Sequence, residues 1–469
     1  MQNRALLCCV CSLGRSRSGA ANLAKTPSFQ TKPLPSRPMR VGIGILGFGT
    51  VGGALLHKLI NENASIATKT GLDIEVVRVA VRDTARTRLV ALPDGVLTDN
   101  PMDVVDDPGV QLVVEIMGGE DPAGDLVAAA LTAGKPVVTA NKALIAARGK
   151  ELIGIAEKSG VPLLFEAAVA GGIPIIRPLS ETLAGEQIDR VLGIVNGTTN
   201  FILTRMTEEG VEYKAALAEA QELGYAEADP AADVSGADAA AKAAILASLA
   251  FGTWVASDRV FTEGIEHIDA TDVRIAGELG YVIKLLAVAE NTAEGISVRV
   301  HPTFVPGDHS LALIRGATNA VFVEGPSFHE LLFAGPGAGG APTATAVLGD
   351  VVDAARELLA GAEVAPPIRF QPGRVLDFDS VATTWYLRLE VVDRPGVLAQ
   401  VAGVFGDNEV SIKSVWQEGE DDGATLLLVT HRHPEGRHRA SLEGLRSLEV
   451  VRHVAAVLRV EGAGPTPNL

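Results

Sequence analysis

The sequence predicts a chain of α/β domains that ends in a small separate module, and three observations lead to this fold class. Short apolar segments alternate with helical segments over residues 41–139, which is the pattern of βαβ units around a parallel sheet. A second α/β pattern begins near residue 162. Residues 385–460 have the order strand, helix, strand, strand, helix, strand, which is typical of a compact ferredoxin-like βαββαβ module.

In the first domain, the predicted strands are 41–46, 74–81, 111–116 and 136–139, and the predicted helices are 51–66 and 125–132. A glycine-rich turn joins the first strand to the first helix, which is the context that a Rossmann-type dinucleotide-binding fingerprint needs. Gly47 allows the tight turn, Gly49 lets the backbone approach a pyrophosphate, and Gly52 lets helix and strand pack closely. A turn without a ligand is the alternative. The expected cofactor-binding residues here are Gly47, Phe48, Gly49, Thr50, Val51 and Gly52.

The choice of cofactor depends on the residues after the second strand. Arg82 stands where an acidic residue would hold a ribose 2′-hydroxyl, and Arg86 and Arg88 follow. A guanidinium at this place suits a 2′-phosphate, so NADP(H) is preferred and NAD(H) is possible. Asp83 competes with this interpretation, and solvated surface arginines are the alternative.

In the second domain, residues 163–165 and 191–195 are predicted strands, and residues 212–223, 237–251 and 271–289 are predicted helices. A glycine-rich loop and a helix at 335–359 could return to the first domain, and Pro366, Pro367 and Pro372 indicate a linker. The C-terminal module is expected to have strands at 385–392, 410–415, 425–430 and 450–460, and helices at 399–405 and 440–446.

Charge and cysteine content exclude several classes of function. The formal net charge is -17, and such a field repels phosphate backbones, so no nucleic-acid partner is expected. No apolar run reaches the length of about 18 residues that a membrane span requires. The three cysteines are Cys8, Cys9 and Cys11, so the rest of the chain has no thiol for a disulfide, a metal or a nucleophile. We expect a cytoplasmic protein.

Residues 1–39 are basic, contain several prolines and hold no acidic residue. A targeting peptide is one interpretation. The preferred interpretation is an unstructured extension, or an upstream start with the real one at Met39, because the apolar stretch 5–13 is short and lacks a clear cleavage site.

Residues 224–242 combine several carboxylates with a lysine around the start of a predicted helix. Asp238 and Lys242 are four residues apart, so their side chains lie one helical turn apart on the same face. A lysine oriented by a carboxylate suits proton donation to an alkoxide that hydride transfer would form. An acidic helix start with an ordinary ion pair is the alternative.

This stretch resembles the signature of homoserine dehydrogenases. The resemblance extends, in the family's order and spacing, to four other motifs, which are Thr139–Lys142, Glu166–Pro174, Gly193–Asn200 and Pro336–Gly340. It implies reduction of L-aspartate 4-semialdehyde to L-homoserine, in the biosynthesis of threonine, methionine and isoleucine, by an NAD(P)-dependent oxidoreductase. The implied enzyme is a homodimer or a homotetramer.

The resemblance also implies roles by position. Lys242, Asp238 and Lys142 are the implied catalytic residues, and Lys142 also lies near the nicotinamide. The residues implied to bind the substrate are Glu227, Asp233, Tyr225, Gly197 and Thr198. A monovalent cation (Na⁺ or K⁺) is implied to be held, largely by backbone carbonyls, at Glu166, Val169, Gly171 and Ile173. The loop implied to close over the cofactor contains Gly337 and Gly339.

Residues 385–398 resemble the opening of an ACT domain. In that family, the turn after the first strand binds a free amino acid together with a partner module, which implies Asp393 and Gly396 here, with Asn408 at the same site. The implied ligand is threonine as an allosteric inhibitor. A dimerisation module without a ligand is the alternative.

The expected boundaries follow from these assignments. They are 1–39 for the extension, 40–161 for the nucleotide-binding domain, 162–334 for the catalytic and dimerisation domain, 335–360 for the returning segment, 361–382 for the linker and 383–461 for the ACT domain.

Two rival functions share some of these features. A phosphorylating semialdehyde dehydrogenase needs a cysteine nucleophile, and the chain has no cysteine after Cys11. The rival from another class is a non-catalytic sensor that binds a nucleotide and an amino acid. Lys142, Asp238 and Lys242 argue against it, because a sensor needs no proton donor.

Overall fold

The computed structural model describes residues 38–88, 90–361, 369–420 and 423–462. Residues 1–37, which hold the three cysteines, and Pro366 and Pro367 of the predicted linker lie outside the described residues. In the described part of the chain, no helix is both long enough and apolar enough to cross a bilayer.

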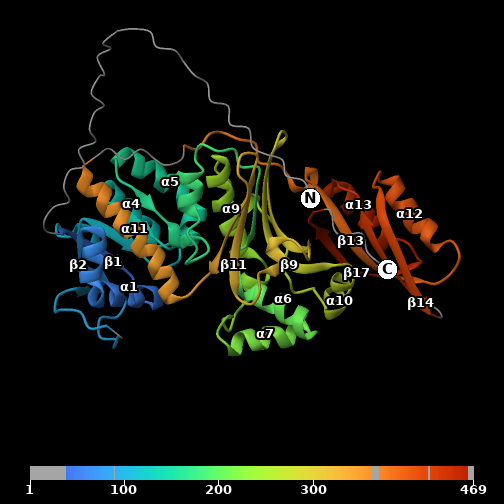
Figure 1. The fold of residues 1–469 in the computed structure, drawn as a ribbon, viewed down its shortest axis with the longest axis horizontal. Coiled ribbons are helices and arrows are strands. Elements are labelled where there is room, and N and C mark those ends of the chain that lie inside the picture. Colours follow the sequence, from blue (N-terminus) through green and yellow to red (C-terminus); the bar gives the residue numbers. More distant parts are fainter. Residues whose placement is uncertain (1–37, 89, 362–368, 421–422, 463–469) are drawn as a thin grey trace, which may run out of the picture. The chain divides into compact units, whose positions relative to one another are not determined.

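The first sheet confirms the Rossmann-type prediction (Figure 1). Its six parallel strands have the order β3-β2-β1-β4-β5-β6. The strands are β1 (Met39–Leu46), β2 (Leu72–Ala80), β3 (Leu97–Thr98), β4 (Leu112–Glu115), β5 (Val137–Thr139) and β6 (Leu163–Leu164); the helices are α1 (Thr50–Asn61), α2 (Asn63–Thr70), α3 (Met102–Asp106), α4 (Ala123–Thr132) and α5 (Lys142–Ser159). The predicted helix 51–66 is thus two helices that meet at Glu62, and α5 was not predicted.

Helices cover both faces of this sheet. On one face, Leu112, Val114 and Val138 pack with α1 and with α11 (Gly340–Ala360), which lies beside α1 (Figure 1). On the other face, Val113 and Val137 pack with α4 and α5. Since adjacent residues of a strand point to opposite faces, a strand buried on both sides is apolar throughout. The segment 335–360 therefore supplies a helix to the core that β1 and α1 build.

The second part of the chain is built on antiparallel strands in the order β12-β11-β7-β9-β10. These are β7 (Arg190–Ile194), β9 (Tyr281–Thr292), β10 (Gly295–Pro306), β11 (Thr318–Gly325) and β12 (His329–Pro336), and the short β8 (Phe261–Thr262) pairs with β10. The helices are α6 (Gly197–Glu209), α7 (Tyr213–Glu222), α8 (Ala231–Val234), α9 (Ala237–Phe251) and α10 (Ala270–Glu278).

The predicted helix 271–289 is wrong in its second half. Helix α10 ends near Gly280, whose φ of 80° is left-handed, and residues 281–292 form β9. Most of β9 is buried on both faces, so its apolar residues run continuously instead of alternating. Such a run does not distinguish a buried strand from a buried helix, and α10 directly before it made the helical interpretation attractive.

The C-terminal module has the predicted βαββαβ order. Its elements are β13 (Ala382–Val392), α12 (Val397–Asp407), β14 (Ile412–Glu420), β15 (Gly423–Thr430), α13 (Glu435–Arg446) and β17 (Val451–Val460), with a short β16 (His433–Pro434) that pairs with β13. The four main strands have the order β17-β13-β15-β14. Strand β17 also pairs in parallel with β10 at Thr303 and Phe304, so the module continues the sheet of the preceding domain.

Candidate active site

The fingerprint turn has the backbone that its glycines predict. Gly47 has a φ of 111°, and a Cβ at this position would lie 2.8 Å from the carbonyl oxygen of Ile116. A Cβ at Gly52 would lie 2.7 Å from the carbonyl oxygen of Gly47, whereas a Cβ at Gly49 would meet open space. Among the described residues, no side chain caps the start of α1. Its free N–H groups and the open side of Gly49 fit a pyrophosphate.

A second glycine loop lies against this turn. A Cβ at Gly340 would lie 3.0 Å from Cγ2 of Thr50, and Gly339 has a φ of 119°. Gly337 leaves no room for a side chain, because a Cβ there would lie 2.0 Å from Nδ2 of Asn319. The predicted cofactor loop 337–339 is therefore adjacent to the start of α1.

Two lysines from different helices contact one carboxylate. Lys142 is the first residue of α5, just after β5, and its Nζ lies 2.5 Å from Oδ1 of Asp238. Lys242 lies one turn after Asp238 on α9, and its Nζ lies 2.6 Å from Oδ2 of Asp238 and donates to the carbonyl oxygen of Val195 at 2.8 Å. The structure thus brings together the three predicted catalytic residues, although Lys142 and Asp238 are 96 residues apart in sequence (238 − 142).

Burial and charge act in opposite directions on Asp238. The side chain is 6% exposed, and this burial alone would raise its pKa. The ammonium groups of Lys242 and Lys142 outweigh the burial and hold the pKa well below its ordinary value. Asp238 therefore stays ionised across the neutral range and keeps both ammonium groups in place.

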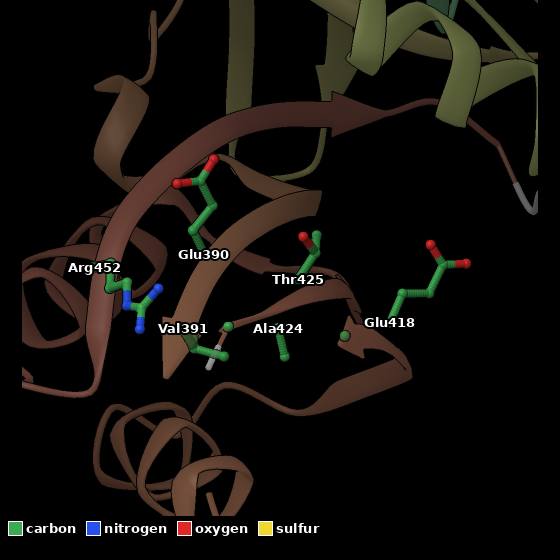
Figure 2. Close-up of a pocket in the computed structure, with 8 residues that line it drawn as sticks. Glu390, Val391, Glu418, Ala424, Thr425 and Arg452 are labelled. Atoms are coloured by element: carbon green, nitrogen blue, oxygen red, sulfur yellow. The ribbon is translucent and has the colours of Figure 1, made fainter. Parts of the chain in front are cut away.

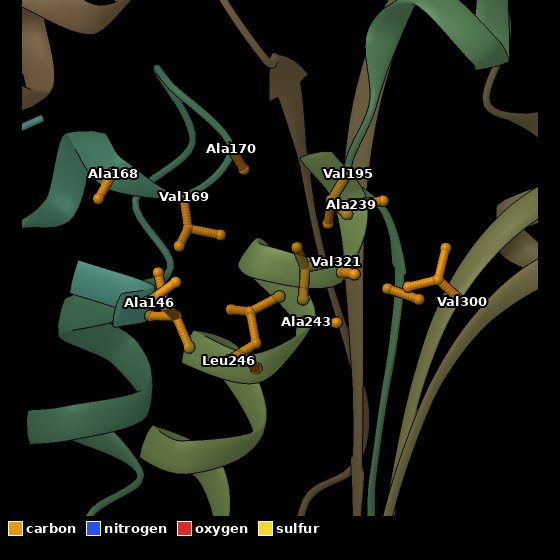
Figure 3. Close-up of a cluster of buried hydrophobic side chains, with 14 of the residues drawn as sticks. Ala146, Ala168, Val169, Ala170, Val195, Ala239, Ala243, Leu246, Val300 and Val321 are labelled. Carbon is orange, nitrogen blue, oxygen red and sulfur yellow. The ribbon is translucent and has the colours of Figure 1, made fainter. Parts of the chain in front are cut away.

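A cluster of small apolar side chains lies around the body of α9. Ala239, Ala243 and Leu246 of α9 are buried with Ala146 of α5 and Val169 (Figure 3). Small residues let α5 and α9 approach closely, which is what places Lys142 beside Asp238. The N-terminal turns of α9 consequently enter the interior, as their apolar continuation predicts.

The junction between β7 and α6 supplies the remaining polar contacts. The Asn196 side chain accepts from the backbone N–H of Thr199 at 2.9 Å, and its Nδ2 donates to Asp233 at 2.7 Å and to Asp238 at 2.9 Å. Thr198 Oγ1 lies 3.2 Å from Oδ2 of Asp233 and donates to the carbonyl oxygen of Tyr225 at 2.7 Å. The motif 193–200 had indicated no role for Asn196, although an Asn directly before a helix is a usual N-cap.

The remaining predicted substrate residues lie at the rim of this cluster. Gly197 begins α6, and a Cβ there would lie 2.8 Å from the carbonyl oxygen of Ala317. The Tyr225 ring packs against Phe201, with centroids 4.8 Å apart. Glu227 is exposed in the connection to α8, and no hydrogen bond or ion pair among the described residues joins its side chain to the cluster.

A pocket of about 310 Å³ connects the two halves of the site. Lys142 and Lys242 line it together with Gly171, Gly337 and Ala338. Gly118, Gly119, Asn141 and Thr343 also belong to its wall. Parallel strands of an open α/β sheet end at the same edge, and ligands bind there. The lysine pair therefore faces the space into which the fingerprint turn would direct a cofactor.

Glu115 is a buried carboxylate that binds the loop in this wall, and it was not among the predicted site residues. It ends β4, accepts from the N–H of Met117 at 2.7 Å and from Thr139 Oγ1 at 2.6 Å, and burial raises its pKa. Asn141 binds the carbonyl oxygen of Gly119 at 2.6 Å. These bonds hold the 117–119 loop beside Lys142. The sequence signal that could have identified Glu115 is a charged residue at the end of an apolar strand.

The predicted cation residues form a tight, buried turn. The carboxylate of Glu166 accepts from the backbone N–H groups of Ile175 at 2.6 Å and Ile176 at 2.8 Å, so its side chain already has partners. Ala170 and Gly171 both have a φ of 55°, and a Cβ at Gly171 would lie 2.4 Å from the carbonyl oxygen of Gly337. Any cation here would therefore contact backbone carbonyls. In the described ranges, no three His, Cys, Asp or Glu side chains form a possible metal site.

The arginines after β2 lie near the fingerprint. Arg88 places its guanidinium 5.3 Å from the ring centroid of Phe48 and donates to the carbonyl oxygens of Asp83 and Arg86. Arg82 is exposed on the same loop. Positive charge is thus available beside the turn, with Arg88 rather than Arg82 in contact with it.

In the C-terminal module, the predicted regulatory residues do not meet within one chain. Gly396 has a φ of 91° and directly precedes α12, three residues after Asp393. Asn408 directly follows α12 and donates to the carbonyl oxygen of Val404. At 1.5 Å per residue the helix separates Gly396 from Asn408 by about 18 Å. A surface pocket of this module lies on its strands instead, where Glu390, Glu418, Thr425 and Arg452 line it (Figure 2).

Comparisons with known proteins agree with this geometry. The family model "Homoserine dehydrogenase" matches residues 174–352, the model of its NAD binding domain matches residues 47–166, and the ACT domain model matches residues 385–446. The homoserine dehydrogenase of Corynebacterium glutamicum is 46% identical over 443 residues, which cover 93% of this chain and 99% of that protein. This chain belongs to the homoserine dehydrogenase family.

Other members of the homoserine dehydrogenase family support the match. That of Synechocystis is 44% identical and covers 90% of this chain and 100% of its own length. The crystal structure of the Thiobacillus denitrificans homoserine dehydrogenase has a TM-score of 0.85 at 43% identity, covering 90% and 98% of the two chains. A hyperthermophilic archaeal homoserine dehydrogenase in complex with NADPH has a TM-score of 0.58 at 31% identity, covering 70% and 100%. The chain therefore carries a nucleotide-binding domain and an ACT domain.

Proposed function

We propose that this chain catalyses the reversible, nicotinamide-dependent reduction of L-aspartate 4-semialdehyde to L-homoserine, in the pathway to threonine, methionine and isoleucine. The observation that carries the proposal is the carboxylate of Asp238 between the ammonium groups of Lys142 and Lys242, at 2.5 and 2.6 Å, in the wall of the pocket. A non-catalytic sensor would have no use for two ammonium groups held in this way.

The two lysines would act on the reacting oxygen. A bound nicotinamide supplies the hydride. As the aldehyde carbon is reduced, negative charge develops on its oxygen, and ammonium groups fixed nearby stabilise that charge without reorganisation. Lys242 then gives its proton to the oxygen, and Lys142 supports the developing charge. Asp238 orients both ammonium groups.

The substrate is an amino acid, so its ammonium group needs an anionic acceptor. Asp233 is half-buried beside Thr198 and Asn196, in the place where a carboxylate could serve this purpose. Glu227 would have to turn inward from its exposed position to assist. Tyr225, Gly197 and Thr198 would form the walls of the same subsite.

We further propose that NADP(H) is the preferred cofactor and that NAD(H) is also used. The start of α1 and the open side of Gly49 would hold the pyrophosphate, while Gly337 and Gly339 would cover it. Arg82 and Arg88 offer guanidinium groups for a 2′-phosphate. A monovalent cation at the 166–173 turn would be held by carbonyls of Glu166, Val169, Gly171 and Ile173, and it would fix the backbone that faces Gly337.

The ACT domain is proposed to bind threonine and to inhibit the enzyme. Since Asp393 and Asn408 lie at opposite ends of α12, a shared site would need the partner module of a dimer. The homodimer or homotetramer and the cytoplasmic location stay predictions.

The direct test is the oxidation of homoserine by the purified full chain, with NADP⁺ and NAD⁺ in turn, with and without threonine. We expect activity with both cofactors, a higher kcat/KM with NADP⁺, and inhibition by threonine. Absence of turnover with either cofactor would contradict the proposed reaction. Activity that threonine leaves unchanged would contradict only the proposed regulation.

A further inference from the structure

We propose that Asn196 is a positioning residue that joins the substrate-binding carboxylate, Asp233, to the lysine-binding carboxylate, Asp238, through a single side-chain amide. The inference rests on the proposed function, because it assigns a purpose to contacts within that site. Asn196 would set the distance and the orientation between the subsite for the substrate's ammonium group and the pair of lysines that acts on its oxygen.

Both hydrogens of the Asn196 amide and one lone pair of its oxygen are engaged in hydrogen bonds. The second lone pair faces the Thr199 hydroxyl, which also lies 3.2 Å from the backbone carbonyl oxygen of Asn196. Nδ2 has two hydrogens, and it donates to Asp233 Oδ1 at 2.7 Å and to Asp238 Oδ2 at 2.9 Å. Oδ1 accepts from the backbone N–H of Thr199 at 2.9 Å and lies 3.0 Å from the hydroxyl of Thr199. A backbone N–H can only donate, so the oxygen must face Thr199 and the NH₂ group must face the carboxylates.

Asn196 is the better-placed donor to Asp233. The only other contact of that carboxylate recorded among the described residues is with Thr198 Oγ1 at 3.2 Å, and this hydroxyl has one proton, which it gives to the carbonyl oxygen of Tyr225 at 2.7 Å. Asn196 therefore occupies Oδ1 of Asp233 and fixes the side-chain rotamer, which leaves Oδ2 for the ammonium group of the substrate.

The neutral amide suits this position better than a charged group would. A lysine or arginine here would compete with the substrate's ammonium group for Asp233 and with Lys242 for Asp238. An aspartate would place a third carboxylate beside them. Because Asn196 is 5% exposed, water cannot easily take over either hydrogen bond if the amide is removed.

The simpler explanation is that Asn196 only caps α6. Asp and Ser cap helices about as well as Asn does, whereas Ala does not. If capping were the whole role, Asn196→Asp and Asn196→Ser would retain both stability and activity. If the amide positions the carboxylates, both variants retain the cap and lose activity.

The experiment compares Asn196→Ser, Asn196→Asp and Asn196→Ala in the full chain, by Tm and by KM for homoserine, KM for the cofactor and kcat. We expect Tm to fall moderately for Ser, because two buried carboxylates lose a donor, and further for Asp, which adds a third carboxylate, and for Ala, which also loses the cap. The kinetics are therefore measured well below the Tm of each variant. For Ser we expect kcat/KM for homoserine to fall by about 10²-fold, shared between a higher KM and a lower kcat, and a larger loss for Asp. The KM for the cofactor should not change, because its proposed contacts lie on other elements.

Asn141 offers a matched control for stability. It caps α5 as Asn196 caps α6, accepting from the N–H of Leu144, and its amide likewise contacts a buried carboxylate, that of Glu115, as well as the carbonyl oxygen of Gly119. Asn141→Ser therefore shows how much Tm changes when one Asn cap becomes Ser.

The inference would be overturned if the Ser or the Asp variant had the same KM and kcat as the wild-type chain. The proposed function would still stand in that case, because the wild-type chain would have oxidised homoserine in the same assay. If the Asp variant does not fold, the Ser variant decides. A fall in activity that only follows a fall in Tm would also overturn the inference. A wild-type chain that does not oxidise homoserine would refute the proposed function, and the inference with it.

Discussion

Replacing Lys242 by Met is expected to abolish most turnover while leaving a folded protein that binds its cofactor. Lys242 is 8% exposed, and its ammonium group has two partners, Asp238 and the carbonyl oxygen of Val195. Met keeps most of the length and the packing of the stem and removes the charge. Asp238 keeps Lys142 and Asn196 as donors, so it is not left bare.

The magnitude follows from these contacts. Loss of a positioned general acid costs about 10²–10⁴ in rate, and loss of one stabilising charge costs a similar factor, but the two effects overlap in one residue. Lys142 remains to support the oxygen, so kcat should fall by about 10³- to 10⁴-fold, which corresponds to about 4–5.5 kcal/mol. The hydrogen bonds that are lost should lower stability by about 1–3 kcal/mol.

The assay measures homoserine oxidation through the absorbance of the reduced nicotinamide, and cofactor affinity through its fluorescence on binding. Lys284 offers a matched control, because it is a buried lysine that binds Asn200 and the carbonyl oxygen of Ile314 outside the pocket. Lys284→Met should cause a much smaller loss of kcat, because Lys284 does not line the pocket. A kcat of Lys242→Met within about tenfold of the wild type would refute the reasoning, because no positioned acid would then have been lost.

Three further predictions concern other parts of the chain. Arg88→Ala should raise the KM for NADP⁺ by about tenfold and that for NAD⁺ much less, since a charged contact to the 2′-phosphate is lost; an unchanged ratio of kcat/KM values would contradict this role. Burial lowers the pKa of Lys284 to about 8 from an ordinary 10.5. Its charge therefore opposes folding below about pH 8, and the stability of the wild type relative to Lys284→Met should rise by up to about 3 kcal/mol as the pH goes from 8 to 10.5; parallel Tm curves would refute this. Gly337→Ala should lower kcat/KM, because its Cβ would lie 2.0 Å from Asn319. Gly349→Ala should leave kcat/KM unchanged, because its Cβ would meet Arg177 at 3.5 Å. Equal activities of the two variants would exclude the close approach between Gly337 and Asn319.

The features that the sequence predicted well depend on local signals. Helix α9 has the predicted bounds because Gly236 and Gly252, both with positive φ, stop it at each end. The strand, turn and helix around the fingerprint were likewise marked by residues adjacent in sequence, as was the pair formed by Asp238 and Lys242.

The features that it predicted poorly depend on contacts between distant segments. Asn196 meets Asp238 across 42 residues and Lys242 meets Val195 across 47, so no spacing in the sequence shows either contact. Strands β10 and β11 were not predicted because a buried antiparallel sheet lacks the clear alternation of a half-exposed one. The separation of Asn408 from Asp393 by the whole of α12 could likewise be seen only in the folded structure.

The pairing of β17 with β10 has a consequence for any test of the proposed feedback control that shortens the chain. Deletion from Ala382 onward would uncover the β10 edge at Thr303 and Phe304, together with the ring of Phe304 that Tyr386 covers at a centroid distance of 4.5 Å. A bare strand edge with an apolar ring beside it invites aggregation. A test of the proposed regulation should therefore use point substitutions within the ACT domain, because a truncation would alter this strand edge as well as the proposed amino-acid site.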